Sequence, residues 1–180
     1  MEDLPGSVIL ERKRIILRPL YVRDADEVFR NWANDPEVAK YVRWSTHENV
    51  DVTREWLATC ETGIGKQNSY DWGIVIRDTD ALIGSIGASW NEEEDRVEVG
   101  YCIGRSYWGK GYTSEALLCM MDYLVTKAGI KHFVSMHAVE NPASGTVMRK
   151  AGFVYVGDGV AQSFDGKRTF PTKIYHWDAP

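Results

Sequence analysis

The chain has 180 residues, a length that fits a single domain over residues 1–180 and does not require two. Its 44% hydrophobic and 26% charged residues are ordinary for a folded enzyme and exclude an intrinsically disordered chain. The net charge of -5 argues against nucleic acid as the main partner, because neutralising phosphates needs a basic surface.

The amino terminus and the cysteines favour a cytoplasmic protein. The first six residues, MEDLPG, are acidic and lack the apolar core of a signal peptide. No uninterrupted apolar stretch is long enough to span a bilayer, so we expect no membrane partner. The cysteines Cys60, Cys102 and Cys119 lack metal-ligand spacing, so we expect free thiols and no metal site.

The predicted elements begin with a strand over residues 8–18 and helices over about 24–34 and 49–60. Apolar residues alternate along the strand until Pro19 ends it. Asp24 is expected to cap the first helix, and Gly63 to close the second. Three strands follow, over 70–77, 82–90 and 96–103. Their short polar links predict an antiparallel meander.

The second half of the chain adds a long amphipathic helix over about 112–128, which Gly129 ends. A strand over 132–139, a helix over 143–151 and a strand pair around Asp165-Gly166 complete the chain. The meander is antiparallel, and one strand-helix-strand crossover adds a parallel pair. The order therefore predicts an α+β fold with a mixed, mostly antiparallel central sheet flanked by helices.

Two glycines between the third meander strand and the long helix indicate an anion site. Gly109 and Gly111 let the backbone approach a ligand closely, and the free N–H groups at a helix N-terminus bind phosphate. The spacing matches neither the dinucleotide fingerprint nor the P-loop. The alternative is a strand-helix turn that needs positive φ and binds nothing.

The segment WGKGYTSEA, from Trp108 onward, resembles the pyrophosphate loop of the GNAT superfamily of N-acetyltransferases. Within it, the closest resemblance is to the RimJ/RimL branch, which contains ribosomal-protein N-terminal acetyltransferases. The resemblance implies the GNAT fold and acetyl-CoA as co-substrate, with the pyrophosphate held by backbone N–H groups. The implied cofactor contacts are Trp108, Gly109, Lys110, Gly111, Tyr112 and Thr113. Thr113 departs from the Gly or Ala that the family has at its position.

A second segment, from Asn141 to Phe153, is similar to the N-x-x-[SA]…K-x-G-F segment of the same family. Taken alone, Asn141 and Pro142 read as a helix start and Gly152 as its end. In the family, the Asn and Ser of this segment face the CoA arm near its sulfur, which implies cofactor contacts at Asn141 and Ser144. Resembling segments near the amino terminus extend the similarity over essentially the whole chain.

The implied reaction is direct attack of an amine on the thioester. Many family members protonate the leaving thiolate with a Tyr, but the aligned residue here is Met148, which cannot donate a proton. The branch suggests Ser144 instead, bonding to sulfur or orienting a water; helix capping is the alternative reading of Ser144. A covalent acetyl on Cys102 is disfavoured because no His partner is evident.

Glu98 is the candidate base. It shares a strand face with Gly100 and Cys102, where a carboxylate is expected only at solvent or at a site. The resemblance implies that this strand splays to admit substrate and that backbone N–H groups at Val99 and Tyr101 hold the acetyl carbonyl. Glu98 would act through water or anchor the amine, with an exposed structural role as the alternative.

Acceptor recognition is expected from the loop over residues 41–47, with Arg43, Trp44 and His47, and from Trp90. A plain surface loop is the alternative. The resemblance favours a protein N-terminal α-amine, whose pKa near 8 leaves it partly free at neutral pH. Polyamines, amino acids or aminoglycosides are alternative acceptors, and a silent acyl-CoA-binding module is a further alternative. We expect a monomer or homodimer.

Overall fold

The computed structural model describes residues 8–64 and 70–180, so the expected absence of a signal peptide in residues 1–6 lies outside the described residues. Within these residues, eight strands form one sheet in the order β1-β2-β3-β4-β5-β6-β8-β7. The strands are β1 (Leu10–Glu11), β2 (Ile15–Arg18), β3 (Tyr70–Ile76), β4 (Leu82–Asn91), β5 (Arg96–Ile103), β6 (His132–Ala138), β7 (Val154–Gln162) and β8 (Thr169–Asp178). Among the described strands, only β5 and β6 pair in parallel, which confirms the mixed, mostly antiparallel sheet of an α+β fold.

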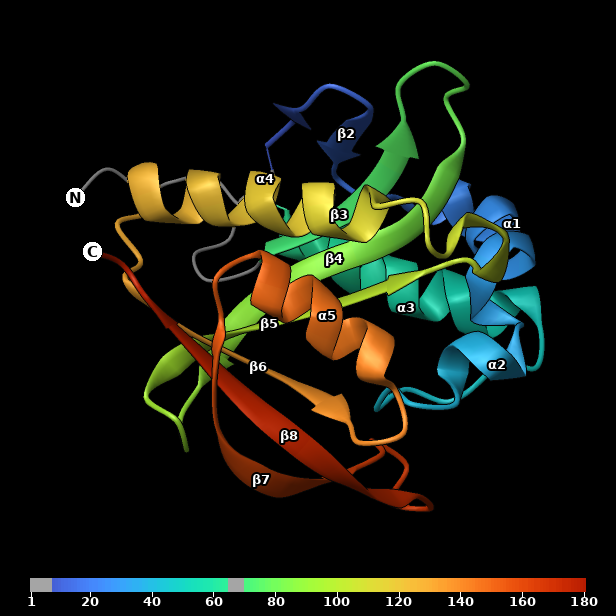
Figure 1. Cartoon of the computed structure of the whole chain (residues 1–180). Coiled ribbons are helices and arrows are strands. Elements are labelled where there is room, and N and C mark those ends of the chain that lie inside the picture. The colour runs from blue at the N-terminus through green and yellow to red at the C-terminus, as the bar shows by residue number, and fades with distance from the viewer. Residues whose placement is uncertain (1–7, 65–69) are drawn as a thin grey trace.

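Helices cover both faces of this sheet (Figure 1). The α-helices are α1 (Ala25–Val28), α2 (Pro36–Ala39), α3 (Val50–Gly63), α4 (Tyr112–Thr126) and α5 (Pro142–Lys150). Shorter segments are the 3-10 helices η1 (Val22–Asp24) and η3 (Arg105–Tyr107) and the π-helical η2 (Phe29–Ala33). Among the described helices, none combines the length and apolar character that a membrane span requires.

In the described part of the chain, the sheet separates two hydrophobic cores, one on each of its faces. On one face, α4 contributes a stripe of buried residues at helical spacing, including Met120 and Leu124, and Met148 of α5 is buried beside them. On the other face, Trp32 and Leu57 are buried in a second cluster formed with α1 and α3. Because side chains alternate along a strand, β5 sends residues into both layers.

The strands β5 and β6 separate after two paired positions. Val97 pairs with Phe133 and Glu98 with Val134, and no further register follows in the described sheet. Beyond that point the Ser135 hydroxyl donates to the carbonyl of Val99 at 3.0 Å. Backbone groups two residues apart point to the same edge, so the N–H groups of Val99 and Tyr101 face this opening.

Of the predicted elements near the amino terminus, the first strand is wrong and the first helix is confirmed but irregular. The single strand over 8–18 is a hairpin of β1 and β2, because the chain turns where the Arg12 N–H donates to the Ile15 carbonyl at 3.0 Å. The helix over 24–34 is split into 3-10, α and π segments. Asp24 is the N-cap residue of α1, as predicted, but its side chain makes no cap bond to α1. Its carboxylate instead accepts from the Tyr21 N–H at 2.9 Å and from both terminal nitrogens of Arg18, at 2.9 and 3.0 Å.

Candidate functional site

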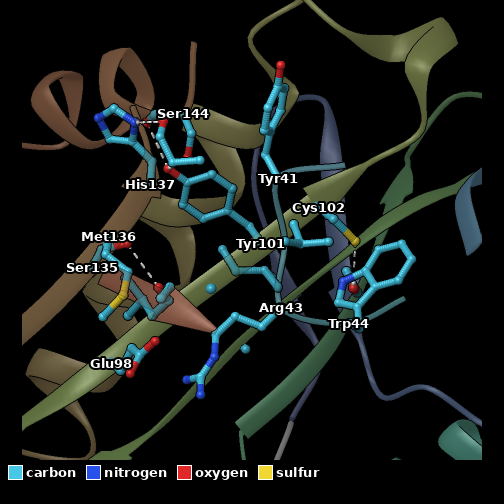
Figure 2. A pocket seen from close by; sticks show the side chains of 18 of the residues that line it. Tyr41, Arg43, Trp44, Glu98, Tyr101, Cys102, Ser135, Met136, His137 and Ser144 are labelled. Carbon is cyan, nitrogen blue, oxygen red and sulfur yellow. Dashed lines mark hydrogen bonds between the residues drawn. The ribbon is translucent and has the colours of Figure 1, made fainter. Parts of the chain in front are cut away.

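A cavity of about 620 Å³ opens where β5 and β6 separate (Figure 2). Residues of β4, β5 and β6, the start of α5, the 41–47 loop and the turn between β7 and β8 line it. The predicted site residues that line this cavity are Arg43, Trp44, His47, Glu98, Val99, Tyr101, Asn141 and Ser144. Segments far apart in sequence therefore bring most of the predicted polar groups to one opening.

A pair of hydroxyls bridges β5 and α5 at this cavity. The Tyr101 hydroxyl donates to the Ser144 carbonyl at 2.9 Å and accepts from the Ser144 hydroxyl at 3.0 Å. Burial raises the pKa of Tyr101, so the phenol stays protonated and remains a donor. Asn141 and Pro142 start α5 as predicted, with Asn141 at the N-cap, but α5 has no side-chain cap bond, and both Asn141 and Ser144 line the cavity.

Glu98 lies half-buried on the strand face opposite Val99 and Tyr101, and it lines the same cavity. Its carboxylate accepts a hydrogen bond from the Asn91 side-chain amide at 2.7 Å. This bond holds the carboxylate in place without neutralising its charge. No sequence pattern indicates this contact, because Asn91 lies at the start of the polar link between the second and third predicted meander strands.

The glycine turn has the backbone geometry that the sequence predicts. Gly109 and Gly111 have φ of +72° and +81°, and the turn leads directly into the N-terminus of the 15-residue helix α4. Among the described residues, none accepts a hydrogen bond from the N–H groups of 109–113. The turn does not line the 620 Å³ cavity. In Figure 1 it connects the far end of β5 to α4.

Two side chains brace the glycine turn. Arg14 donates to the Lys110 carbonyl at 2.9 Å and pairs with Glu115 at 2.8 Å, so a cation lies beside the turn. No spacing pattern indicates this role of Arg14, which lies about a hundred residues away in the chain. Trp108 donates its indole N–H to the Ile103 carbonyl at 2.9 Å while its ring is half exposed.

The loop over 41–47 packs its aromatic residues against α3. His47 Nδ1 is 2.8 Å from the Thr53 hydroxyl, and its ring lies edge-on between Trp44 and Trp56. Burial lowers the pKa of His47, so the neutral imidazole is favoured. His47 and the two indoles thus form an aromatic wall of the cavity.

Trp90, expected at the acceptor site, does not belong to the cavity. Its side chain is 54% exposed near the hairpin end of β4, outside the residues that line the opening. Two lining residues were missed instead, Ser135 and His137. The Nδ1 of His137 donates to the Ala138 carbonyl at 2.7 Å, and its buried Nε2 has no partner among the described residues.

Cys102 also lines the cavity, but its surroundings do not activate a thiol. Its sulfur lies 3.3 Å from the Ser85 hydroxyl, and burial raises the pKa of the thiol. Cys60 and Cys119 are likewise free and buried. Among residues 8–64 and 70–180, no group of three or more His, Cys, Asp or Glu side chains could hold a metal ion.

Comparison with known proteins gives a family match over most of the chain. A family model described as an acetyltransferase (GNAT) domain matches residues 14–154. An uncharacterized N-acetyltransferase of Bacillus licheniformis is 30% identical over 145 residues, covering 80% of this chain and 81% of that relative. The ribosomal-protein-serine acetyltransferase of Escherichia coli is 30% identical over 92 residues, covering 51% of each chain.

Solved structures share the fold at low sequence identity. An acetyltransferase of the GNAT family from Bacillus anthracis has a TM-score of 0.81 at 19% identity, covering 95% of this chain and 98% of that one. The Microcin C7 self-immunity acetyltransferase MccE, solved with acetyl-CoA and AMP, has a TM-score of 0.76 at 18% identity, with 93% of each chain covered. The expected sheet-and-helix architecture therefore occurs in solved acetyltransferases.

Proposed function

This chain belongs to the acetyltransferase (GNAT) domain family, and from that premise we propose that it acetylates the α-amine of a protein N-terminus with acetyl-CoA. The observation that carries the acceptor is the similarity to the ribosomal-protein-serine acetyltransferase of Escherichia coli. N-acetyltransferase activity follows from the family, whereas the acceptor is our proposal.

The described residues fit acetyl-CoA at two places. The glycine turn offers the free N–H groups of 109–113 and the positive end of α4 to the pyrophosphate, and Arg14 adds a nearby cation. The opening between β5 and β6 leads from that side of the sheet to the cavity, and the N–H groups of Val99 and Tyr101 face it. These two N–H groups would hold the acetyl carbonyl and its developing negative charge.

Glu98 would receive the acceptor on the other face of β5. An α-amine, with a pKa near 8, is partly free at neutral pH and needs only modest help from a base. The amine nitrogen attacks the thioester carbon, and its excess proton leaves through water to Glu98. The carbon-sulfur bond then breaks, and the thiolate of CoA takes up one proton to leave as the thiol.

The hydroxyl pair would serve the leaving thiolate by hydrogen bonding. A thiol has a pKa near 8.5, whereas burial raises the pKa of Tyr101 above its ordinary value near 10. Tyr101 and Ser144 are therefore weaker acids than the thiol and do not yield it a proton outright. Ser144 would turn its O–H from Tyr101 to the sulfur, while the Tyr101 hydroxyl keeps Ser144 in position through its bond to the Ser144 carbonyl. Met148, fully buried, plays no part in this step.

Release of CoA, followed as free thiol, tests this proposal with peptides that begin with Ala or Ser. The proposal predicts turnover that disappears when the peptide N-terminus is blocked. Turnover only on polyamines or aminoglycosides would keep the reaction and overturn the acceptor. Binding of acetyl-CoA without turnover on any of these amines would indicate a silent acyl-CoA-binding module.

A further inference from the structure

We propose that Arg43, at the mouth of the cavity, binds a carboxylate of the acceptor, so that preferred acceptors carry a carboxylate as well as the reacting amine. The proposal deepens the acceptor site described above and rests on it. It assigns a charge preference to the acceptor, which membership of the family does not specify.

Arg43 has free hydrogen-bonding capacity at the cavity. Its Nε donates to the Gln162 carbonyl at 3.1 Å, and its guanidinium lies 4.7 Å from the centre of the Phe164 ring. Among the described residues, none pairs with its two terminal nitrogens. In Figure 2 the side chain runs toward the part of the cavity that holds Glu98. These two terminal nitrogens, in the plane of the guanidinium, can donate two parallel hydrogen bonds to a carboxylate.

The loop that carries Arg43 is clamped to the turn between β7 and β8. The Arg168 guanidinium donates to four carbonyls in this loop and the end of α2 before it, those of Ala39, Lys40, Val42 and Trp44, at 2.9, 3.2, 3.1 and 2.7 Å. The Phe164 N–H donates to the Arg43 carbonyl at 2.8 Å. Arg43 is therefore held before an acceptor arrives, which lowers the entropic cost of binding.

The charged side chains at the cavity suit an acceptor that carries both an amine and a carboxylate. Glu98 would face the amine, and Arg43 would face the carboxylate; no ion pair joins the two among the described residues. The aromatic wall with Trp44 and Trp56 lines the same cavity and suits the apolar part of an acceptor. A polyamine or aminoglycoside, cationic throughout, would instead meet the like charge of Arg43.

Matched ligand pairs test this preference by binding, read from the intrinsic tryptophan fluorescence of the whole chain. One pair is phenylalanine and phenylalaninamide, and the other is a peptide beginning Ser-Asp and its Ser-Asn counterpart. We expect the carboxylate member of at least one pair to bind roughly fivefold more tightly, the size of an exposed ion pair. Whichever pair shows the preference identifies the source of the carboxylate, an amino acid or a peptide side chain.

Variants test whether the Arg43 side chain causes the preference for the carboxylate ligand. Arg43→Gln should bring the ratio close to one, and Arg43→Lys should keep part of it, because the charge remains without the two parallel hydrogen bonds. Arg23→Gln is the control: it removes the same charge from a guanidinium that also stacks on an aromatic ring, 4.4 Å from the centre of Tyr21, and should leave the ratio unchanged.

Equal binding within both pairs, or a preference that survives in Arg43→Gln, would overturn the inference. Turnover is recorded separately with the same ligands. Failure to acetylate any α-amine would overturn the proposed function, while the fluorescence ratio would still decide the role of Arg43. The preference should also shrink as salt rises, since Arg43 is exposed.

Discussion

The hydroxyl pair of Tyr101 and Ser144 gives the sharpest prediction about catalysis. Tyr101→Phe removes one oxygen that takes part in two hydrogen bonds, at 2.9 and 3.0 Å. At about 1 kcal/mol for each neutral bond, the loss in folding stability is about 2 kcal/mol at most. The Ser144 hydroxyl also loses the partner that positions it.

The kinetic effect follows from the charge on the leaving sulfur. A hydrogen bond to a charged group contributes about 1.5 to 3 kcal/mol, so Ser144→Ala should lower kcat by roughly tenfold to a hundredfold. Tyr101→Phe should lower kcat by about tenfold, with little change in the KM for peptide, because it acts through Ser144. The double variant should then be no slower than Ser144→Ala alone.

Free-thiol release measures all three variants, and thermal unfolding shows that each is folded. Tyr155→Phe is the matched control, because it also removes a phenol hydroxyl with one hydrogen bond, to Asp158 at 2.9 Å, and lies outside the cavity. An unchanged kcat in Tyr101→Phe would contradict the proposed role of Tyr101 in positioning Ser144. So would losses in the two single variants that multiply in the double variant.

Three further predictions concern the base, the glycine turn and the aromatic wall. Glu98→Gln should lower kcat/KM by about a hundredfold and change the acidic limb of its pH profile, while exposed Glu93→Gln should do neither; an unchanged limb would contradict the role as base. Gly109→Ala and Gly129→Ala, at φ of +72° and +68° with open space at both, should each cost about 1 kcal/mol of stability; calorimetry should show weaker acetyl-CoA binding only for Gly109→Ala, and equal binding would contradict the phosphate site. Because burial lowers the pKa of His47, the unfolded chain binds more protons below about pH 6.5, so stability is full above that pH and falls as pH drops. Thermal melts at several pH values should show a smaller acid loss in His47→Gln, and an identical slope would contradict the assignment.

The parts of the fold that could be predicted are those with a regular spacing of apolar residues. The meander, α4 and α5 have apolar spacing that matches their burial, so their bounds agree closely with the structure. The segment before the meander agrees less well, because contacts between residues distant in the sequence determine its structure. The carboxylate of Asp24, the predicted cap residue, pairs with Arg18, and no spacing rule reveals that partner.

The candidate site likewise has features that local sequence patterns predict and features that only the fold reveals. Strand alternation placed Glu98 and Tyr101 on opposite faces of β5, and both line the cavity as residues of one splayed strand. The partner of Tyr101 lies 43 residues away, and the carbonyls bound by Arg168 lie more than a hundred residues away, so only the fold brings them together. That residues 1–180 form one domain stays a prediction.

The most direct test of the account uses one peptide with a free Ser N-terminus and a single internal Lys. After incubation with acetyl-CoA and the protein, fragmentation by mass spectrometry locates the acetyl group. The account predicts acetylation at the N-terminal α-amine, with none when Ser144 and Glu98 are both replaced. Acetylation of the Lys side chain with the α-amine left free would contradict the proposed acceptor.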